Sequence, residues 1–356
     1  MYDCSNDVLA YHDDEVTLPQ TERDEMRDRR NANRDRLKRG LKKAGGPQPV
    51  FNSQGSYAML TMVQYPDKAY DIDDGVYFAK ENLTGPHGGE MSALEARQMV
   101  RDAVDDGSFK TPPEVRSKCV RVHYAAGYHV DLPVYRRVIE KDLFGTETEH
   151  YELAASEWKR SDARHVTKWF DEENRKQSPD IVNGRQLRRV TREIKKFAVS
   201  RSSWKGPILN GFGITKLVTE RYRKDGMRED VALHDTMRAI RDRLNVNLVV
   251  QHPCTPDDTI TTGQEDSKAV FLRDRFSEAL AWLEPLSKVD CDRETALKCW
   301  DKVFATKFFS NRLKMEKEAQ AGGGGLALLT SGLLRRQGDD AAAQRAVRKE
   351  GGGRYA

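Results

Sequence analysis

Three aspartates in two separate segments have the spacing expected of a divalent-cation site. Asp71 and Asp73 lie two residues apart in one β-like run, and Asp131 lies in a second run rich in β-branched and aromatic residues. In a strand, alternate side chains project from the same face, so Asp71 and Asp73 would lie about 6.5–7 Å apart along it. Carboxylates this close repel each other unless a cation offsets their charge. The pattern therefore predicts bound Mg²⁺, with Mn²⁺ as an alternative ion.

Asp131 would complete this site if its strand lies beside the strand of Asp71 and Asp73. Three carboxylates can bind two metal ions, of which one activates an attacking ribose hydroxyl and the other binds a triphosphate and its leaving pyrophosphate. We assign Asp131 to orienting or deprotonating the nucleophile. The alternative interpretation of an Asp-x-Asp pair in a highly charged chain is an acidic surface turn.

A short turn upstream of the acids is suited to phosphate. In Gln54-Gly55-Ser56, the glycine permits close approach of the backbone to a ligand, and Ser56 can cap a short helix while offering N–H and O–H donors. A Gly-Ser turn, an Asp-x-Asp pair and a distant third Asp on a strand match, in order and spacing, the DNA polymerase β type of nucleotidyltransferase.

The elements that must position these residues are mixed in the first half of the chain and helical in the second. Charged residues over 21–43 predict a long solvated helix, which ends at Gly45-Gly46-Pro47. Two β-like runs, 70–78 and 120–134, are separated by a helical pattern over 92–104. Further helices are predicted over 161–174, 184–199, 214–223, 231–244, 267–283 and 293–309. The fold class is therefore α+β.

Composition favours a cytoplasmic protein. Of the 356 residues, 33% are charged, and no apolar stretch approaches the roughly 20 residues of a membrane-spanning helix. The five cysteines are scattered and lack zinc-binding spacing, which fits a reducing compartment, and the start of the chain does not have the pattern of a signal peptide. The net charge of +4 is too small to indicate a nucleic-acid partner.

Three segments resemble the active-site segments of the cGAS/DncV-like nucleotidyltransferases of bacterial CBASS anti-phage systems, particularly the group around the DncV cyclic GMP-AMP synthase. They are QGSYAML, YDIDDGVYF and HVDLPVY, and a weaker resemblance extends to about Asp258. It implies a polymerase β-like nucleotidyltransferase core with a long N-terminal brace helix over 1–155. A helical lobe over 156–318 would close the nucleotide cleft, and a Gly-rich flexible tail would follow over 319–356.

The same resemblance implies an enzyme that condenses ATP and GTP, or other nucleoside triphosphates, into a 3′,3′-linked cyclic dinucleotide and releases pyrophosphate. Such an enzyme acts on its downstream effector only through the product. Two alternatives stay open: a linear oligonucleotide synthetase or other nucleotidyltransferase, and an inactive adaptor of the same fold that binds RNA through basic helices. The chain has no cysteine and histidine cluster like the zinc thumb of animal cGAS, so we expect no activation by DNA.

Several residues outside the acidic cluster are candidate nucleotide contacts. Residues 181–197 predict an amphipathic helix with one basic face, which is either solvated or ligand-binding. The resemblance assigns Lys195 first, and Lys196 second, to nucleotide phosphate. Asn210 stands where relatives often have a serine that touches phosphate or sugar. Arg121 is within reach of a triphosphate, or else forms a salt bridge at a strand edge.

An acid near the end of the resemblance is a candidate base-reading group. Asp257 or Asp258 matches the position of an acid that reads a purine edge in the cyclic GMP-AMP synthase. A carboxylate that accepts from guanine N–H groups would favour GTP. A helix N-cap is the alternative role for either residue.

The chain ends in Gly351-Gly352-Gly353-Arg354-Tyr355-Ala356, a composition typical of an exposed and flexible terminus. In some relatives a comparable terminus is conjugated to targets by a ubiquitin-transfer-like partner. A small final residue such as Ala356 on a glycine-rich tether would suit that reaction. The alternative is a disordered end with no such role.

Overall fold

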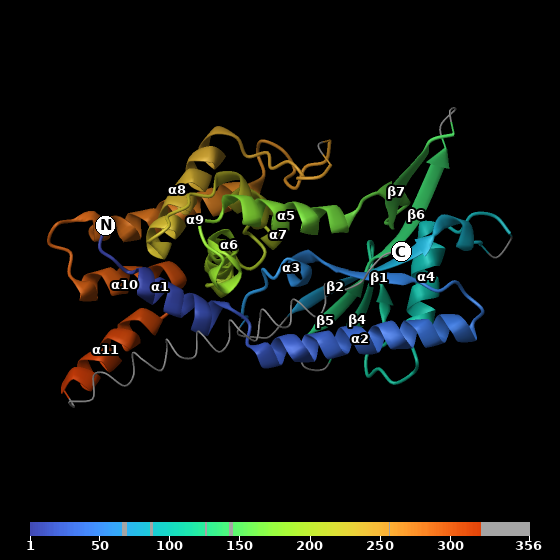
Figure 1. The fold of residues 1–356 in the computed structure, drawn as a ribbon, viewed down its shortest axis with the longest axis horizontal. Coiled ribbons are helices and arrows are strands. Elements are labelled where there is room, and N and C mark those ends of the chain that lie inside the picture. The colour runs from blue at the N-terminus through green and yellow to red at the C-terminus, as the bar shows by residue number, and fades with distance from the viewer. Residues whose placement is uncertain (66–69, 86–87, 125–126, 142–144, 256, 322–356) are drawn as a thin grey trace.

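The computed structural model describes residues 1–65, 70–85, 88–124, 127–141, 145–255 and 257–321. These residues form two lobes, one built on a mixed β-sheet and one built of helices (Figure 1). The predicted α+β fold is therefore confirmed. No helix of the described residues is both long enough and apolar enough to span a membrane.

The sheet lobe contains one eight-stranded sheet in the order β3-β4-β5-β2-β6-β7-β8, with β1 paired to the other edge of β2. Strand β2 pairs in parallel first with β5 and then with β6, and antiparallel with β1. The strands are β1 Val50–Gln54, β2 Asp71–Ala79, β3 Glu114–Val115, β4 Val120–His123, β5 His129–Leu132, β6 Val134–Lys141, β7 Glu147–Ala154 and β8 Trp158–Arg160. Strand β2 is therefore paired on both edges and lies inside the sheet.

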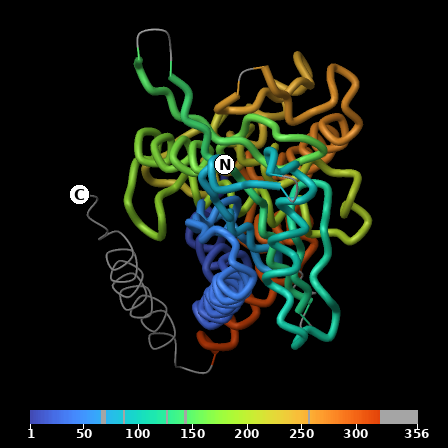
Figure 2. The backbone as a smooth tube through the Cα atoms, turned by 90° about the vertical axis from the view of Figure 1, so that its right-hand side faces the viewer, coloured from blue at the N-terminus to red at the C-terminus, as the bar shows by residue number. Residues whose placement is uncertain are grey.

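The long helix α2, Gln20–Lys43, runs along the sheet lobe, and Figure 2 looks nearly along its axis. Its sparse apolar side chains, Met26, Leu37 and Leu41, are fully buried, which explains how so polar a helix is held in place. It packs against α4, Ala93–Val104, a helix that begins with a capping box in which Ser92 and Glu95 satisfy each other's backbone N–H groups.

The helical lobe has a large aromatic core. Its biggest fully buried side chains are those of Tyr11, Phe170, Phe197, Phe276, Trp300 and Phe309. The helices are α5 Ala163–Gln177, α6 Gln186–Ala198, α7 Gly211–Arg221, α8 Glu229–Val246, α9 Ser267–Leu283, α10 Arg293–Phe304 and α11 Phe308–Ala321. Short helices are α3 Gly55–Ala58, η2 Lys80–Asn82, η3 Val182–Gly184, η4 Ser202–Trp204 and η5 Glu284–Ser287.

The first residues of the chain pack on the helical lobe and not on the sheet lobe. They form helix α1, Ser5–Tyr11, and a π-helical turn η1, His12–Val16. The backbone N–H of Cys4 donates to the Asp230 carboxylate at 2.9 Å, and the Tyr11 ring lies 4.5 Å from the Phe304 ring. The sequence assigned these residues to the nucleotidyltransferase core over 1–155. It could not identify their partners in the helical lobe, such as Asp230 for Cys4, which is more than 200 residues away in the chain.

Three local expectations also differ from the structure. The β-like run 120–134 is a hairpin of β4 and β5 that leads directly into β6. The helical pattern 293–309 is two helices, because Ala305 adopts a left-handed conformation with φ of 51°. The basic face of α6 is not solvated, since Arg189, Arg192 and Lys195 are all buried. Each difference arises from a turn or a tertiary contact that residue periodicity does not encode.

The packing of α2 against α4 depends on Gly40. A Cβ added there would lie 1.9 Å from the Ala103 carbonyl oxygen. An exposed helical Gly→Ala change stabilises a protein by up to about 1 kcal/mol, whereas Gly40→Ala forces two helices apart and should destabilise it by about 1–3 kcal/mol. Urea unfolding measures the difference. Lys42→Ala, on the exposed face, is the control and should change stability by less than about 0.5 kcal/mol; stabilisation by Gly40→Ala would contradict the close packing.

Candidate functional site

The register between β2 and β5 brings the three predicted acids together. Asp71 pairs with His129, and Asp73 pairs directly with Asp131. Neighbouring strands lie about 4.8 Å apart, and paired positions on parallel strands project to the same face. The two separate segments therefore lie side by side in the sheet, as the sequence predicts, whereas metal binding by the three acids stays a prediction.

Asp73 lies at the centre of this group, where its charge is least compensated. Burial, and then the negative charges of Asp131 and Asp71, raise its pKa to about 7 against the opposing effect of Arg121. The first residue of α3 packs against it: Gly55 has φ of 66°, and a Cβ there would lie 2.2 Å from Asp73 Oδ2. Glycine is therefore required at position 55 for both its conformation and its lack of a side chain.

Arg121 supplies the positive charge that faces Asp131. It lies on β4 directly opposite Asp131, and its Nε and Nη2 donate to the two carboxylate oxygens at 2.7 Å each. Nη2 is also 3.9 Å from Asp71 Oδ1, and His129 Nδ1 lies 3.2 Å from the same oxygen. Of the two roles considered for Arg121, the salt bridge is present, and the same side chain also lines the cavity described below.

The donor chemistry of the three acids fits a divalent cation. Carboxylate oxygens are the ligands that Mg²⁺ prefers, and burial together with the neighbouring charges of Asp131 and Asp71 raises the pKa of Asp73. No three His, Cys, Asp or Glu side chains among the described residues are arranged to hold an ion together, and both Asp131 oxygens accept from Arg121. Metal binding by all three acids would therefore require Arg121 to release Asp131.

A cavity of about 850 Å³ opens over the acids, between the sheet lobe and the helical lobe. Asp71 and Asp73 line it, whereas Asp131 lies beneath Arg121 and is not part of the lining. The predicted nucleotide contacts that line it are Gln54, Gly55, Ser56, Arg121, Lys195 and Asn210. Lys196, Asp257 and Asp258 do not line it. The structure thus gathers most, but not all, of the predicted residues around one space.

Gln54 holds the floor of the cavity beneath the Gly55 turn. Its Nε2 donates to the Tyr135 hydroxyl at 3.1 Å, and its Oε1 accepts from the Tyr77 hydroxyl at 3.3 Å. The two tyrosine rings are stacked with centroids 4.6 Å apart. Because both ends of the amide are bonded within the protein, Gln54 fixes the turn more directly than it faces a ligand.

Lys195 is a buried amine at the wall of the cavity. Its Nζ donates to the hydroxyl and the carbonyl of Thr61, at 2.9 and 3.2 Å. Burial, reinforced by the positive charge of Arg192, lowers its pKa to about 7. Lys196 points elsewhere and donates to the Gln64 carbonyl at 3.0 Å. Of the two lysines, only Lys195 is therefore placed to meet a ligand in the cavity.

The remaining candidates have defined structural partners. Asn210 caps α7 by accepting from the Gly213 N–H at 2.8 Å. Asp258 forms an ion pair with Lys159 at 3.1 Å, and Asp257 is exposed. Neither acid caps a helix, since α9 begins with Asp266 as its N-cap. The N-cap role considered for Asp257 and Asp258 is therefore wrong in this structure.

The helical lobe contributes cavity residues that the sequence did not indicate. Lys205 precedes α7, and Lys268 lies in the first turn of α9, so each is an isolated lysine outside any motif. Asp162, which caps α5 and pairs with Arg164, also lines the wall. No local pattern in the sequence linked the two lysines to the acids.

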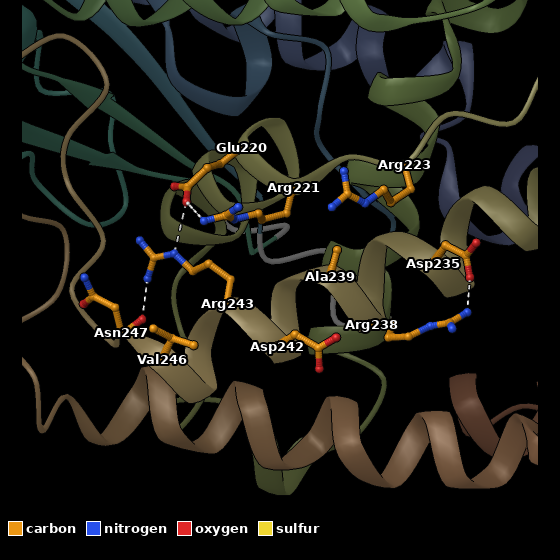
Figure 3. A pocket seen from close by; sticks show the side chains of 10 residues that line it. All are labelled: Glu220, Arg221, Arg223, Asp235, Arg238, Ala239, Asp242, Arg243, Val246 and Asn247. Carbon is orange, nitrogen blue, oxygen red and sulfur yellow. Dashed lines mark hydrogen bonds and ion pairs between the residues drawn. The ribbon is translucent and has the colours of Figure 1, made fainter.

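A second hollow, of about 710 Å³, is lined by residues at the end of α7 and along α8 (Figure 3). Its charged side chains mostly satisfy one another. Glu220 accepts from Arg243 at 3.1 Å and lies 3.2 Å from Arg221, and Arg238 pairs with Asp235. None of the predicted site residues lines this hollow. The cavity over Asp71 and Asp73 is therefore the candidate site.

The fold and the acidic site define a nucleotidyltransferase, and comparison with known proteins agrees. Residues 49–135 match the family model for the nucleotidyltransferase domain of cyclic GMP-AMP synthase DncV-like proteins. This segment contains the Gly-Ser turn and all three acids. The segment 49–135 is therefore similar to the nucleotidyltransferase domain of DncV-like proteins, and the fold of the chain is that of a nucleotidyltransferase of this type.

Solved structures of DncV share the whole fold at low sequence identity. Escherichia coli DncV in a 3′-deoxy GTP bound form matches with a TM-score of 0.66 and 16% identity, over 87% of this chain and 98% of that one. Vibrio cholerae DncV with nonhydrolyzable GTP gives 0.66 and 16%, over 86% and 97%. The same protein with the linear intermediate 5′ pppA(3′,5′)pG gives 0.62 and 16%, over 82% and 91%. The likeness therefore includes the helical lobe, beyond the matched domain.

Gly55→Ala tests the contact between the turn and Asp73. The added methyl group displaces the Asp73 carboxylate, and a misplacement of about 1 Å at a reacting centre costs roughly a hundredfold in rate. We expect pyrophosphate release from nucleoside triphosphates to fall by at least that factor. Gly107→Ala is the control, since Gly107 has a similar φ of 77° with open space around it. Equal losses of rate in both variants would show that backbone strain alone, and not the contact with Asp73, is responsible.

Proposed function

We propose that this protein condenses ATP and GTP into a 3′,3′-linked cyclic dinucleotide and releases pyrophosphate. The observation that carries the proposal is the pairing of Asp73 with Asp131 at the floor of a cavity between the two lobes. Relatives of the same fold are named for GTP, for the synthesis of cyclic AMP-GMP and for a linear pppA(3′,5′)pG intermediate. The product would act as a second messenger in anti-phage signalling.

Asp71, Asp73 and Asp131 would hold two divalent ions, Mg²⁺ in the first place. When bound, these ions supply activation of the attacking hydroxyl and stabilisation of the leaving pyrophosphate. Asp131 would also orient the attacking hydroxyl, because it is paired with Asp73 and is approached by Arg121 from the other side. Release of Asp131 would leave the Arg121 guanidinium free to pair with the triphosphate.

The turn and the cations around the cavity would bind the phosphates. Gly55 and Ser56 offer backbone N–H groups at the edge nearest Asp73, while Lys195, Lys205 and Lys268 approach from the helical lobe. Lys195 has no carboxylate among its hydrogen-bond acceptors, so a triphosphate would be its nearest compensating anion. Asn210 would contribute an amide at the sugar or phosphate, as relatives do with serine.

The structure weakens the RNA-binding alternative. That reading rests on a solvated basic face along α6, yet Arg189, Arg192 and Lys195 are buried and bonded within the protein. The phosphate backbone of an RNA could not reach these buried side chains unless the contacts between the two lobes were broken. The cavity and its acids favour a small nucleotide.

The setting of the enzyme remains part of the proposal. We propose a cytoplasmic enzyme that communicates with its effector only through the product. Conjugation through Ala356 by a ubiquitin-transfer-like partner stays a prediction, since residues 322–356 lie outside the described residues. Base selection by Asp257 or Asp258 is likewise a prediction, and both lie outside the cavity lining.

Removal of the acids should abolish synthesis. With labelled ATP, GTP and Mg²⁺, we expect a product that resists phosphatase, because a cyclic dinucleotide has no terminal phosphate. Asp71→Ala and Asp73→Ala each remove a metal clamp worth several kcal/mol in the transition state, so the rate should fall at least about a thousandfold. Asp28→Asn is the control, since Asp28 is an exposed acid of α2 outside the cavity lining, and it should leave the formation of pyrophosphate within about threefold of wild type. A phosphatase-sensitive product would instead favour a linear oligonucleotide synthetase.

The low pKa of Lys195 predicts a pH-dependent contact with the triphosphate. Below pH 7 the amine is charged before binding, whereas above pH 7 it must take up a proton to pair with phosphate, so its contribution weakens as the pH rises. The pKa of Asp73 is also about 7, so its titration would affect nucleotide binding over the same pH range. The measurement is therefore made in a protein that carries Asp73→Asn. In this background, Lys195→Met should raise the Kd for a nonhydrolysable GTP analogue by tenfold or more at pH 6 and by clearly less at pH 9. An equal effect at both values would contradict the role of Lys195.

A further inference from the structure

The segment from Leu60 to Gln64, called here the 60–64 segment, joins the phosphate-binding turn to the helical lobe. It follows α3 directly, and the Thr61 N–H donates to the Ser56 carbonyl at 2.9 Å. Leu60 has φ of 55°, a left-handed conformation that a branched side chain rarely adopts. The segment is thus bonded to the turn at one end and held in a conformation that surrounding contacts must maintain.

Three cations of α6 maintain it by bonding to its main chain. Arg192 Nε donates to the Leu60 carbonyl at 2.8 Å. Lys195 Nζ donates to the Thr61 carbonyl and hydroxyl, and Lys196 Nζ donates to the Gln64 carbonyl. One face of a helix in the helical lobe therefore holds three main-chain carbonyls of the 60–64 segment, those of Leu60, Thr61 and Gln64.

The N-terminal part of the chain holds the same segment from the other side. The Gln64 N–H donates to the Val16 carbonyl at 3.0 Å, and Gln64 Nε2 donates to the Asp14 and Thr17 carbonyls. Arg192 joins both sets of contacts, because its Nη1 lies 3.2 Å from His12 Nε2 and donates to Thr17 Oγ1 at 3.2 Å.

Arg192 is an unusual buried cation because its acceptors are all neutral. They are a carbonyl, an imidazole nitrogen and a hydroxyl, and its side chain is nearly inaccessible. Burial lowers the pKa of His12 to about 4, so its ring is neutral and its Nε2 can accept from the guanidinium, while Nδ1 donates to Asp13. Arg189, one turn away, instead forms ion pairs with Glu229 and Asp180.

A buried charge without an ion pair costs several kcal/mol, and an apolar side chain of similar length would avoid that cost. A purely structural role is therefore better served by another residue. What an apolar residue lacks is the ability to donate at once to the Leu60 carbonyl and to the N-terminal turn. The contacts of Arg192 thus favour control of the position of the 60–64 segment over a gain in stability.

We infer that Arg192 is a positioning residue for nucleotide binding, which holds the Leu60 carbonyl and, through Thr61 and Ser56, sets the Gly55–Ser56 turn for the incoming triphosphate. The inference rests on the proposed role of that turn in binding nucleotide. His12 and Thr17, which accept from Arg192, would then help to position the same turn, although they lie far from the acids in sequence.

Arg192→Met, with Arg188→Met as its matched control, tests the inference in the full-length protein. Arg188 lies one turn away on α6 and bonds to Asp171 and Gly184, with no contact to the 60–64 segment. For Arg192→Met we expect the KM for nucleoside triphosphates to rise about tenfold or more, and amide hydrogen exchange at Thr61 and Gln64 to accelerate. For Arg188→Met we expect an unchanged KM and unchanged exchange at these amides. Arg192→Lys, which retains one donor, should recover part of the KM.

Both variants are compared under conditions in which urea unfolding shows each to be fully folded. An Arg192→Met enzyme with the wild-type KM, or with wild-type exchange at Thr61, would overturn the inference while leaving the proposed function intact. Equal rises in KM for both variants would also overturn it, since they would indicate a general loosening of α6. If wild-type protein neither binds nor consumes any nucleoside triphosphate, the proposed function fails, and the exchange data still decide whether Arg192 holds the segment.

Discussion

The mutual repulsion of three carboxylates is the constraint on which the rest of the structure depends. Parallel pairing of β2 with β5 places Asp73 directly beside Asp131 and leaves Asp71 one pleat away. The protein places one fixed cation, Arg121, against Asp131 and leaves Asp73 with a pKa near 7. An unbalanced negative charge of this kind, at the floor of a cavity, is what attracts divalent ions and, with them, a triphosphate.

Elements around the acids keep this arrangement rigid. On the α2 side, Arg34 bonds to both carboxylate oxygens of the fully buried Asp74, at 2.7 and 2.5 Å, and Ser53 donates to the same group. The brace helix is thereby tied to the residue that follows Asp73. From β1, Gln54 is bonded to two stacked tyrosines. The acids therefore lie on strands β2 and β5 inside the sheet, supported by β1 and the long helix α2.

Helix α6 shows how the two lobes are joined. A sequence with four arginines and two lysines in and beside one helix suggests an exposed basic face. In the structure these side chains have different partners: Arg189 meets acids, Arg192 meets neutral acceptors, and Lys195 and Lys196 meet main-chain carbonyls of the sheet lobe. Helix α6 therefore both lines the cavity and holds the 60–64 segment in place.

The sequence by itself determined the chemistry and the class of fold. Alternation in the run of Asp71 and Asp73 fixed their shared direction, because side-chain direction in a strand follows from residue parity. Helical periodicity located α2, α4 and α5 to α9 to within a few residues, and the order and spacing of the motifs indicated a nucleotidyltransferase. These are local properties of the chain, or patterns of residue order, and need no knowledge of distant neighbours.

Tertiary structure alone decided which groups meet. Strand register places Asp131 beside Asp73 and opposite Arg121, which forms a salt bridge with it. Packing between the lobes buries Lys195. Packing also returns residues 4–16 to the helical lobe and brings Lys205 and Lys268 to the cavity. Such contacts join residues tens to hundreds of positions apart, and their energies depend on burial, so a residue's type and its near neighbours do not specify them.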